Sequence, residues 1–248
     1  METGQKSLNK LLSEMTELGL NSMALSLENL YYSKDFLELD HLSLLHYIVG
    51  AEYQTKVTKK IANRLAKAKL VNCPCEIHNC VDSREREYLP NGITSALAEL
   101  SFIRNGLNVC ILGPSDSGKS YLAKAVGIVA CNEYRVAYFH CGSFTEEMVS
   151  MKNCDFRKYQ KKMTYYSKTD LLILDDFLLH TITDEREIKV LFEILEKRSE
   201  LRKSTIVCSQ REPRSWASMM MNDEVSSNAI LKRVTKHYTV VINPRDNS

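Results

Sequence analysis

The sequence predicts an α/β protein in which a parallel sheet of five strands is flanked by helices and preceded by a small all-α domain. Three observations carry this prediction. Short β-rich apolar runs alternate with helical patterns over residues 93–248, which is typical of parallel strands joined by helices. Residues 1–70 lack proline and repeat apolar residues at helical spacing. Residues 71–92 lose that periodicity and contain Pro74 and Pro90, which indicates a connecting segment.

Composition and charge describe an ordinary soluble protein. The 248 residues are 44% hydrophobic and carry a formal net charge of +2, so partners have to be inferred from local charge clusters. No apolar run approaches the roughly 20 residues that a bilayer span needs, and the N-terminus lacks a signal pattern. We therefore expect a cytoplasmic protein without membrane contact. Most of the eight cysteines lie in apolar strands or helices, as reduced core residues do.

The helical domain, residues 1–70, ends in a helix with one strongly basic flank. After Tyr53 an apolar stripe continues through Val57, Ile61 and Leu65, and no acidic residue interrupts the basic ones. The candidate DNA contacts on this flank are Lys56, Lys59, Lys60, Arg64 and Lys67. Such a flank can follow phosphates without reading bases. Solvated surface lysines are the alternative interpretation.

A phosphate-binding loop follows the first predicted strand, residues 108–112. Residues 113–120 match the eight-residue pattern of such loops and precede a predicted helix. Glycines at both ends let successive backbone N–H groups point inward, and the helix adds its positive N-terminal end. Lys119 would reach the β- and γ-phosphates, and the Ser120 hydroxyl would bind Mg²⁺. The expected nucleotide-binding residues are Gly113, Pro114, Ser115, Asp116, Ser117, Gly118, Lys119, Ser120 and Tyr121.

A second motif supports the first. The apolar strand 171–174 ends abruptly in Asp175 and Asp176, where a parallel sheet places its ligands. Asp175 is expected to hold Mg²⁺, and Asp176 is the candidate for polarising the attacking water. The alternative, a solvated helix N-terminus, would explain one aspartate but not the pairing with the loop. The two motifs together predict ATP and Mg²⁺ as cofactors.

These motifs resemble the AAA+ ATPases of the IstB type, helper proteins of bacterial transposition related to the DnaC and DnaI helicase loaders. The resemblance covers nearly the whole chain and is most specific in residues 100–120, 171–176, 204–210 and 216–234. It implies a P-loop AAA+ domain over residues 93–248. Because the chain ends soon after its last predicted strand, we expect no C-terminal helical lid.

The resemblance also implies two further catalytic residues. Gln210 corresponds to the family's first sensor of the γ-phosphate. Arg233 corresponds to an arginine that is supplied to the nucleotide of a neighbouring subunit, which implies a homo-oligomer. Arg211 and Arg214 compete with Arg233 for this role. With Lys119 and Asp176, these residues complete the expected catalytic set.

A second basic cluster lies between the predicted strands 135–139 and 171–174. Its candidate DNA contacts are Arg157, Lys158 and Lys161, with Tyr159 and Tyr165 among them. In related AAA+ proteins this region resembles the element that faces the central axis of the oligomer. We expect both basic clusters to grip duplex DNA without sequence preference, with solvated lysines again the alternative.

The resemblance implies an ATP-dependent transposition helper that binds ATP, oligomerises on duplex DNA and delivers this target to a transposase, with ATP hydrolysis as the reset. One alternative is a loader of a replicative helicase, as DnaC and DnaI are. Another is a nucleotide-gated DNA-binding protein with little hydrolysis. The helper is preferred because the helical domain and residues 216–234 look most like the IstB type.

Cys73, Cys75, His78 and Cys80 are residues of the kinds that bind zinc. Structural zinc sites place two ligand pairs on either side of a longer loop. Here all four residues fall within 73–80, which would crowd a tetrahedral site. Cysteines of a connecting segment are therefore the favoured interpretation.

Overall fold

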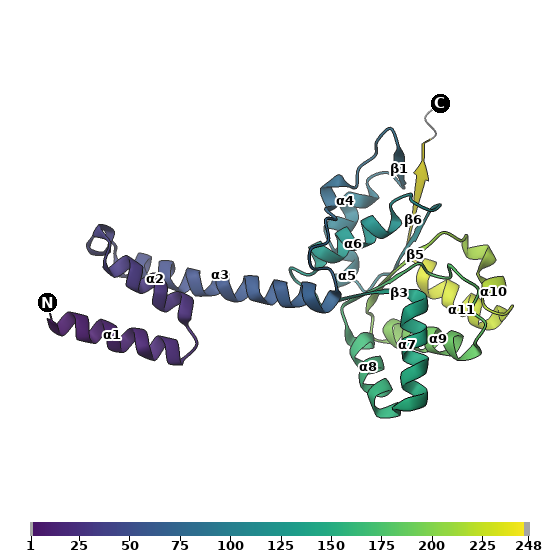
Figure 1. The fold of residues 1–248 in the computed structure, drawn as a ribbon. Helices are drawn as coiled ribbons and strands as arrows, with labels where there is room; N and C mark the ends of the chain where they lie inside the picture. Colours follow the sequence, from purple (N-terminus) through teal and green to yellow (C-terminus); the bar gives the residue numbers. More distant parts are fainter. Residues whose placement is uncertain (1, 246–248) are drawn as a thin grey trace. The chain divides into compact units, whose positions relative to one another are not determined.

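The computed structural model describes residues 2–245. The chain divides into two compact units, residues 1–63 and 64–248. The first unit is entirely helical, as predicted, and its helices are α1 (Glu2–Glu17), α2 (Asn21–Tyr31), the 3-10 turn η1 (Lys34–Leu37) and the part of α3 (His41–Ala68) before residue 64 (Figure 1). Its core is small and consists of Leu8, Met15, Ala24, Leu27 and Ile48.

One buried carboxylate organises this helical unit. Glu52 of α3 accepts hydrogen bonds from the backbone N–H groups of Ser22 at 2.9 Å and Met23 at 3.1 Å. Both groups lie in the first turn of α2, where backbone donors have no partner within the helix. Glu52 therefore fixes the start of α2 to the middle of α3.

The second unit is a six-stranded sheet in the order β1-β6-β2-β5-β4-β3. The strands are β1 (Arg86–Leu89), β2 (Val109–Leu112), β3 (Val136–His140), β4 (Leu171–Asp175), β5 (Ser204–Ser209) and β6 (Tyr238–Pro244). The five predicted strands are confirmed as β2 to β6, and they pair in parallel.

The expected strand count is one too low. The sixth strand, β1, pairs antiparallel with β6 and lies in the segment 71–92 that we expected to be a connection. Its sequence, Arg-Glu-Tyr-Leu, lacks an apolar run, and it is paired to one neighbour only. The free edge of β6, rather than local strand propensity, explains why this segment becomes a strand.

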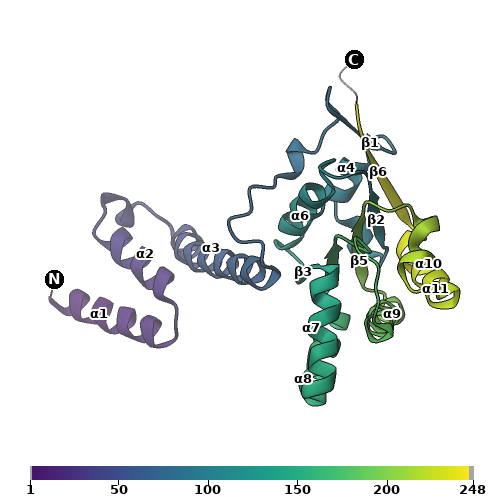
Figure 2. The same cartoon turned by 45° about the vertical axis from the view of Figure 1, so that its right-hand side comes forward.

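Helices cover both faces of the sheet. They are α4 (Ile93–Ala98), α5 (Ser101–Arg104), α6 (Lys119–Ala130), α7 (Cys141–Cys154), α8 (Phe156–Lys168), α9 (Glu185–Glu200), α10 (Trp216–Met219) and α11 (Glu224–Thr235), with 3-10 turns η2 (Ile77–Asn79) and η3 (Pro213–Ser215). Figure 2 shows α6 on one side of the sheet and α9, α10 and α11 on the other. Within residues 2–245, no helix is both long and apolar enough to cross a membrane.

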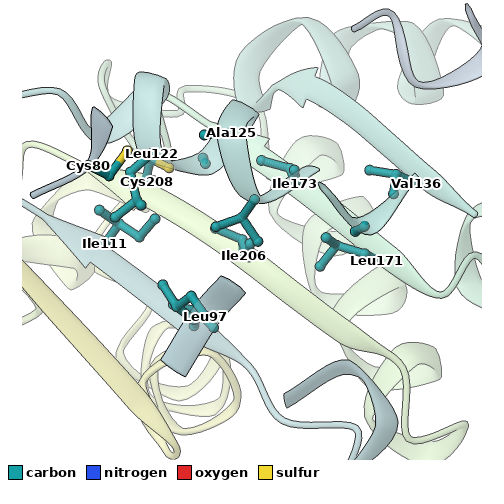
Figure 3. Packing of buried hydrophobic residues seen from close by; sticks show 14 of the residues in the cluster. Cys80, Leu97, Ile111, Leu122, Ala125, Val136, Leu171, Ile173, Ile206 and Cys208 are labelled. Atoms are coloured by element: carbon teal, nitrogen blue, oxygen red, sulfur yellow. The ribbon is translucent and has the colours of Figure 1, made fainter. Parts of the chain in front are cut away.

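The central strands are buried on both faces, so alternate residues enter different cores. On the α6 side, Leu122 and Ala125 of the helix pack with the strand residues Ile111, Ile173 and Ile206 (Figure 3). On the other side, the intervening strand residues pack against α7, α9 and α11. This explains why the strands read as continuous apolar runs in the sequence.

Candidate functional site

The carboxyl ends of four parallel strands, β2, β5, β4 and β3, lie side by side at one end of the sheet. Polar side chains gather at this end. The register pairs Leu112 of β2 with Ser209 of β5, and His140 of β3 with Asp175 of β4. The loop after β2 therefore shares this end with the aspartate pair and with Gln210. Carboxyl ends of parallel strands are the usual place for ligands in such sheets.

The loop 113–118 has the backbone of an anion-binding cradle. Gly118 has φ of 99° immediately before α6, a conformation that strains any residue with a side chain. At Gly113 a Cβ atom would lie 2.6 Å from the carbonyl oxygen of Ile242 and equally close to Ser117 Oγ. Both glycines are therefore required by the loop itself. The loop delivers its N–H groups to the start of a helix of 12 residues, which favours an anion.

The cationic side chain at the loop has no ionic partner within the described residues. Lys119 is buried, with 6% of its surface exposed. Its Nζ donates to the neutral Pro114 carbonyl at 2.5 Å. Burial lowers the pKa of Lys119, and Asp175 and Asp176 act in the opposite direction. Ser117 Oγ is also buried without a hydrogen-bond partner. An uncompensated cation and an orphaned hydroxyl at a glycine cradle fit a bound phosphate chain.

Asp175 is fully buried at the end of β4. One oxygen, Oδ2, accepts a hydrogen bond from the Tyr138 hydroxyl at 2.5 Å, and Oδ1 accepts from the backbone N–H of Asp176 at 3.0 Å. Burial, followed by the hydrogen bond to Asp175, raises the pKa of Tyr138. The carboxylate predicted to hold Mg²⁺ is thus oriented by a tyrosine of the neighbouring strand. No sequence pattern points to Tyr138.

Asp176 adopts φ of 52° and turns its side chain toward β3. Its Oδ2 lies 2.9 Å from His140 Nδ1. His140, the last residue of β3, was also missed by the sequence analysis. The signal was a polar residue ending a neighbouring apolar strand, but its partner became evident only once β3 and β4 were known to be adjacent.

A cavity of about 290 Å³ unites most of the predicted residues. Its lining comprises Ser115, Asp116, Gly118, Lys119, Ser120, Tyr121, Asp176 and Gln210. Asp175 does not line it, because its carboxylate is covered. Ser120 and Asp176 both line this cavity, and a hydroxyl and a carboxylate are oxygen groups of the kind that Mg²⁺ prefers. The residues present therefore fit a magnesium nucleotide.

The segment 71–92 closes over the start of α6 through Tyr121. The Tyr121 hydroxyl donates to the Pro74 carbonyl at 3.3 Å and accepts from the Glu76 backbone N–H at 3.1 Å. The Asn79 side chain donates to the same hydroxyl at 3.3 Å. Tyr121 thus ties this segment to the helix that follows the loop.

Arg233 lies away from the loop of its own chain. Its guanidinium pairs with Glu196 of α9 and lies 5.1 Å from the centre of the Phe192 ring. Its carbonyl accepts from the side chain of Asn108, at the start of β2, whereas the loop follows the end of that strand. Arg233 therefore lies at the opposite end of β2 from Gly113.

The basic candidates differ in how much of their charge is free. In α3, Arg64 donates to the carbonyls of Cys131 and Asn132, at 3.2 and 2.6 Å, and Lys56 lies 3.4 Å from Glu52. The exposed members of this group without an acidic partner are Lys59, Lys60 and Lys67. In α8, the exposed members are Arg157, Lys158 and Lys161. Among the described residues, none of these six has an acidic partner within 4 Å.

The cysteines of the connecting segment do not form a cluster of metal ligands with His78 among the described residues. Cys73 and Cys75 place their sulfurs 3.3 Å apart, and His78 instead contacts Glu76 at 2.9 Å. Across residues 2–245, no group of three or more histidine, cysteine or acidic side chains has an arrangement that could hold a metal ion.

Comparisons with known proteins agree with this geometry. The sequence profile of the family described as IstB-like ATP binding protein matches residues 13–248. An insertion sequence ATP-binding protein of Sinorhizobium fredii is 30% identical over 223 residues, which cover 90% of this chain and 89% of that protein. The ATP-binding protein of insertion sequence IS21 from Pseudomonas aeruginosa is 26% identical over 235 residues, covering 92% of this chain and 86% of that protein.

Solved structures show the same fold. The crystal structure of the DnaC helicase loader matches with a TM-score of 0.55 at 16% identity, covering 70% of this chain and 98% of that chain. DnaA from Aquifex aeolicus bound to AMPPCP matches with a TM-score of 0.55 at 24% identity, covering 69% of this chain. That match spans 51% of the DnaA chain. At these identities the similarity establishes a P-loop AAA+ fold.

Proposed function

The chain belongs to the IstB-like ATP-binding protein family, and from this membership we propose that it is an ATP-dependent helper of transposition. It binds Mg-ATP, oligomerises on duplex DNA and presents that DNA to a transposase, and hydrolysis resets the complex. Because its proposed substrate is duplex DNA, we expect the protein to act in the cytoplasm. The observation that carries this proposal is the cavity that joins Lys119, Ser120, Asp176 and Gln210.

Each of these residues has a role that its position supports. The backbone N–H groups of 113–118 and the Lys119 ammonium bind the phosphates. The Ser120 hydroxyl would hold Mg²⁺ directly. Asp175 is fully buried, so it would hold the metal through an intervening water molecule. When bound, the metal neutralises charge on the phosphate oxygens.

We assign the hydrolysis step to Asp176 and Gln210, which line the same cavity as Lys119 and Ser120. Asp176 orients the attacking water and accepts its proton, and His140 holds Asp176 in place through their 2.9 Å contact. Gln210, directly after β5, is exposed at the same cavity and would contact the γ-phosphate. The carboxylate of Asp is one methylene shorter than that of Glu, so the water has to approach closely.

The position of Arg233 supports action in trans. Because it lies at the start of β2 and the loop lies at the end, it cannot serve the nucleotide of its own chain. A head-to-tail assembly would bring the Arg233 of one copy toward the loop of the next. Arg233 would then exchange its pairing with Glu196 for a phosphate oxygen, which couples hydrolysis to assembly.

The relatives favour a transposase as the partner. The proteins that match over most of the chain are named as insertion sequence ATP-binding proteins. DnaC resembles the chain in fold alone, at 16% identity. A helicase loader therefore remains the second candidate, and a helicase that copurifies with this chain in place of a transposase would favour it.

Two substitutions test the nucleotide switch. Lys119→Ala should weaken Mg-ATP binding by about 100-fold, because a charge-assisted phosphate contact is lost, and should abolish ATP-dependent assembly on duplex DNA. Asp176→Asn should assemble on duplex DNA as the wild type does. Its complex with DNA should then persist, because the bound ATP is not hydrolysed. Sedimentation of labelled duplex DNA with and without ATP measures both effects.

Lys189→Ala removes an exposed lysine of α9 and serves as the charge-matched control. The proposal is wrong if Lys119→Ala assembles on DNA with the same ATP dependence as this control. It is also wrong if the folded wild-type protein shows no heat on titration with Mg-ATP.

A further inference from the structure

Arg86 belongs to the outer strand β1 and lies at the end of the sheet where the phosphate loop begins. Strand β1 runs antiparallel to β6, and the register places Arg86 opposite Pro244, at the carboxyl end of β6. Strand β6 is parallel to β2, with Val241 opposite Leu112. Figure 1 shows β1 beside β6. The added strand therefore carries a cationic residue to the end of β2.

The side chain of Arg86 points to the loop. Alternation along a strand places Arg86 and Tyr88 on the same face, and Tyr88 is buried in the core cluster shared with α6. A Cβ atom built on Gly118 would lie 2.7 Å from Arg86 Nη1 and 3.9 Å from the Tyr88 hydroxyl oxygen. The guanidinium thus rests directly against the sixth residue of the loop.

The guanidinium of Arg86 interacts with the Tyr88 hydroxyl on the same face of β1 and has no close acidic partner among the described residues. Its acidic contact among the described residues is Glu85 at 3.9 Å, and the Glu85 side chain is 75% exposed. A solvent-exposed pair at this distance contributes little. The Arg86 side chain is 33% exposed, so part of it faces solvent at the loop. A planar, permanently charged group with several donors is suited to phosphate oxygens.

We propose that Arg86 is a nucleotide-binding residue supplied in cis, whose guanidinium contacts the phosphate oxygens cradled by residues 113–118. This inference rests on the proposed ATP-binding function and adds a residue outside the loop and its aspartates. Residue 118 has to be glycine at φ of 99°, and the guanidinium lies in the space that a side chain there would enter. Gly118 lines the cavity and Arg86 does not, so the guanidinium would reach the bound phosphate from the outer side of Gly118.

The consequence is that the segment 71–92 takes part in nucleotide binding. It is held to α6 through Tyr121 and to β6 through β1. A contact between Arg86 and phosphate would connect this segment to the presence of nucleotide.

The test compares Arg86→Gln with Arg84→Gln, which removes the same charge from an exposed position two residues away. Competition against a fluorescent ADP analogue, with Mg²⁺ present, measures the affinities for ATP, ADP and adenosine. Arg86→Gln should weaken ATP and ADP by about tenfold each and leave adenosine unchanged, because one charge-assisted phosphate contact is lost. Arg84→Gln should match the wild type, and thermal melting should be equal for both variants.

Arg86→Lys keeps the charge without the planar fork and should fall between Gln and the wild type for ATP and ADP. Equal affinities of Arg86→Gln and the wild type would overturn the inference. Tighter binding of ATP by Arg86→Gln would also overturn it, since Arg86 would then compete with phosphate. An equal loss for adenosine would assign Arg86 to the shape of the site instead. A wild type that binds no nucleotide would overturn the proposed function together with the inference.

Discussion

His140 and Asp176 form a contact between two neighbouring strands at the end of the sheet where hydrolysis is proposed. Asp176 has a backbone φ of 52°, and its side chain is 31% exposed. Neither the backbone nor burial therefore holds its carboxylate in one direction. The contact at 2.9 Å from His140 Nδ1 supplies that restriction. We therefore propose that His140 is a positioning residue, which acts on the reaction through Asp176.

Replacing His140 with Ala should lower the rate of ADP formation about tenfold, because the water-orienting carboxylate loses its hydrogen-bond partner. The affinity for ATP should stay within about twofold of the wild type, since the phosphates are bound elsewhere in the cavity. His140→Asn can still donate and should recover most of the rate. His180→Ala, an exposed histidine on the same side of the site, is the control. A rate for His140→Ala equal to that of His180→Ala would contradict the role.

The residues of the candidate site differ in how well the sequence identifies them. The loop pattern and the aspartate pair identify Lys119, Ser120 and Asp176, because their chemistry requires fixed spacing along the chain. Tyr138 and His140 carry no such spacing. Their positions depend on β3 lying next to β4, which is a property of strand order. Arg233 illustrates the same point, since its pairing with Glu196 joins two separate helices.

The sequence predicts strands that are apolar and misses the one that is polar. Strands β2 to β6 are short apolar runs, and all five were identified from the sequence. Strand β1 was missed because it is polar and depends on the edge of β6. Helix α8 presents a different case, because it is strongly amphipathic. Its buried residues Tyr159, Met163 and Tyr166 face the core, and its exposed side is basic.

Helix α8 is held to the sheet by a buried arginine of α9. Arg198 donates to the carbonyls of Tyr166 and Thr169, near the end of α8, and to the Thr205 hydroxyl in β5. Burial lowers the pKa of Arg198 to about 9. The hydrogen bonds to α8, to the residue that follows it and to β5 compensate this buried cation for its lost hydration. The basic surface of α8 is therefore mounted rigidly on the AAA+ domain.

This surface provides a test of DNA contact. The triple variant Arg157→Gln, Lys158→Gln and Lys161→Gln should bind duplex DNA more weakly, and the slope of log affinity against log salt should fall by about 2.7 per subunit if each residue neutralises one phosphate. Fluorescence anisotropy over a salt series, with ATP present, measures the slope. The control replaces Lys189, Lys232 and Lys236, which are exposed on α9, on α11 and just after α11. A slope equal in the two triple variants would remove α8 from the DNA interface.

At the scale of the whole molecule, the proposed site is incomplete within one chain. The cavity contains the groups proposed to bind phosphate and to orient water, whereas Arg233 lies at the far end of β2. The sequence indicated this division only through resemblance to the IstB-type ATPases, since nothing in the spacing of residues 113–233 shows which residues meet across copies. A heterologous assembly would resolve the division, because each copy would offer one surface with the loop and another with Arg233.

Mixing two inactive variants tests that division. Asp176→Asn binds ATP and supplies Arg233, whereas Arg233→Ala supplies an intact Asp176. Each alone should hydrolyse ATP poorly in the presence of duplex DNA, but an equal mixture should regain about a quarter of the wild-type rate, because that share of interfaces in a random assembly joins both intact groups. The double variant, mixed with either single variant in place of its complement, should restore nothing. Because Arg233 also pairs with Glu196, thermal melting has to show that Arg233→Ala is folded. A folded and assembled mixture whose rate equals the sum of its parts would show that Arg233 does not act on a neighbour's nucleotide.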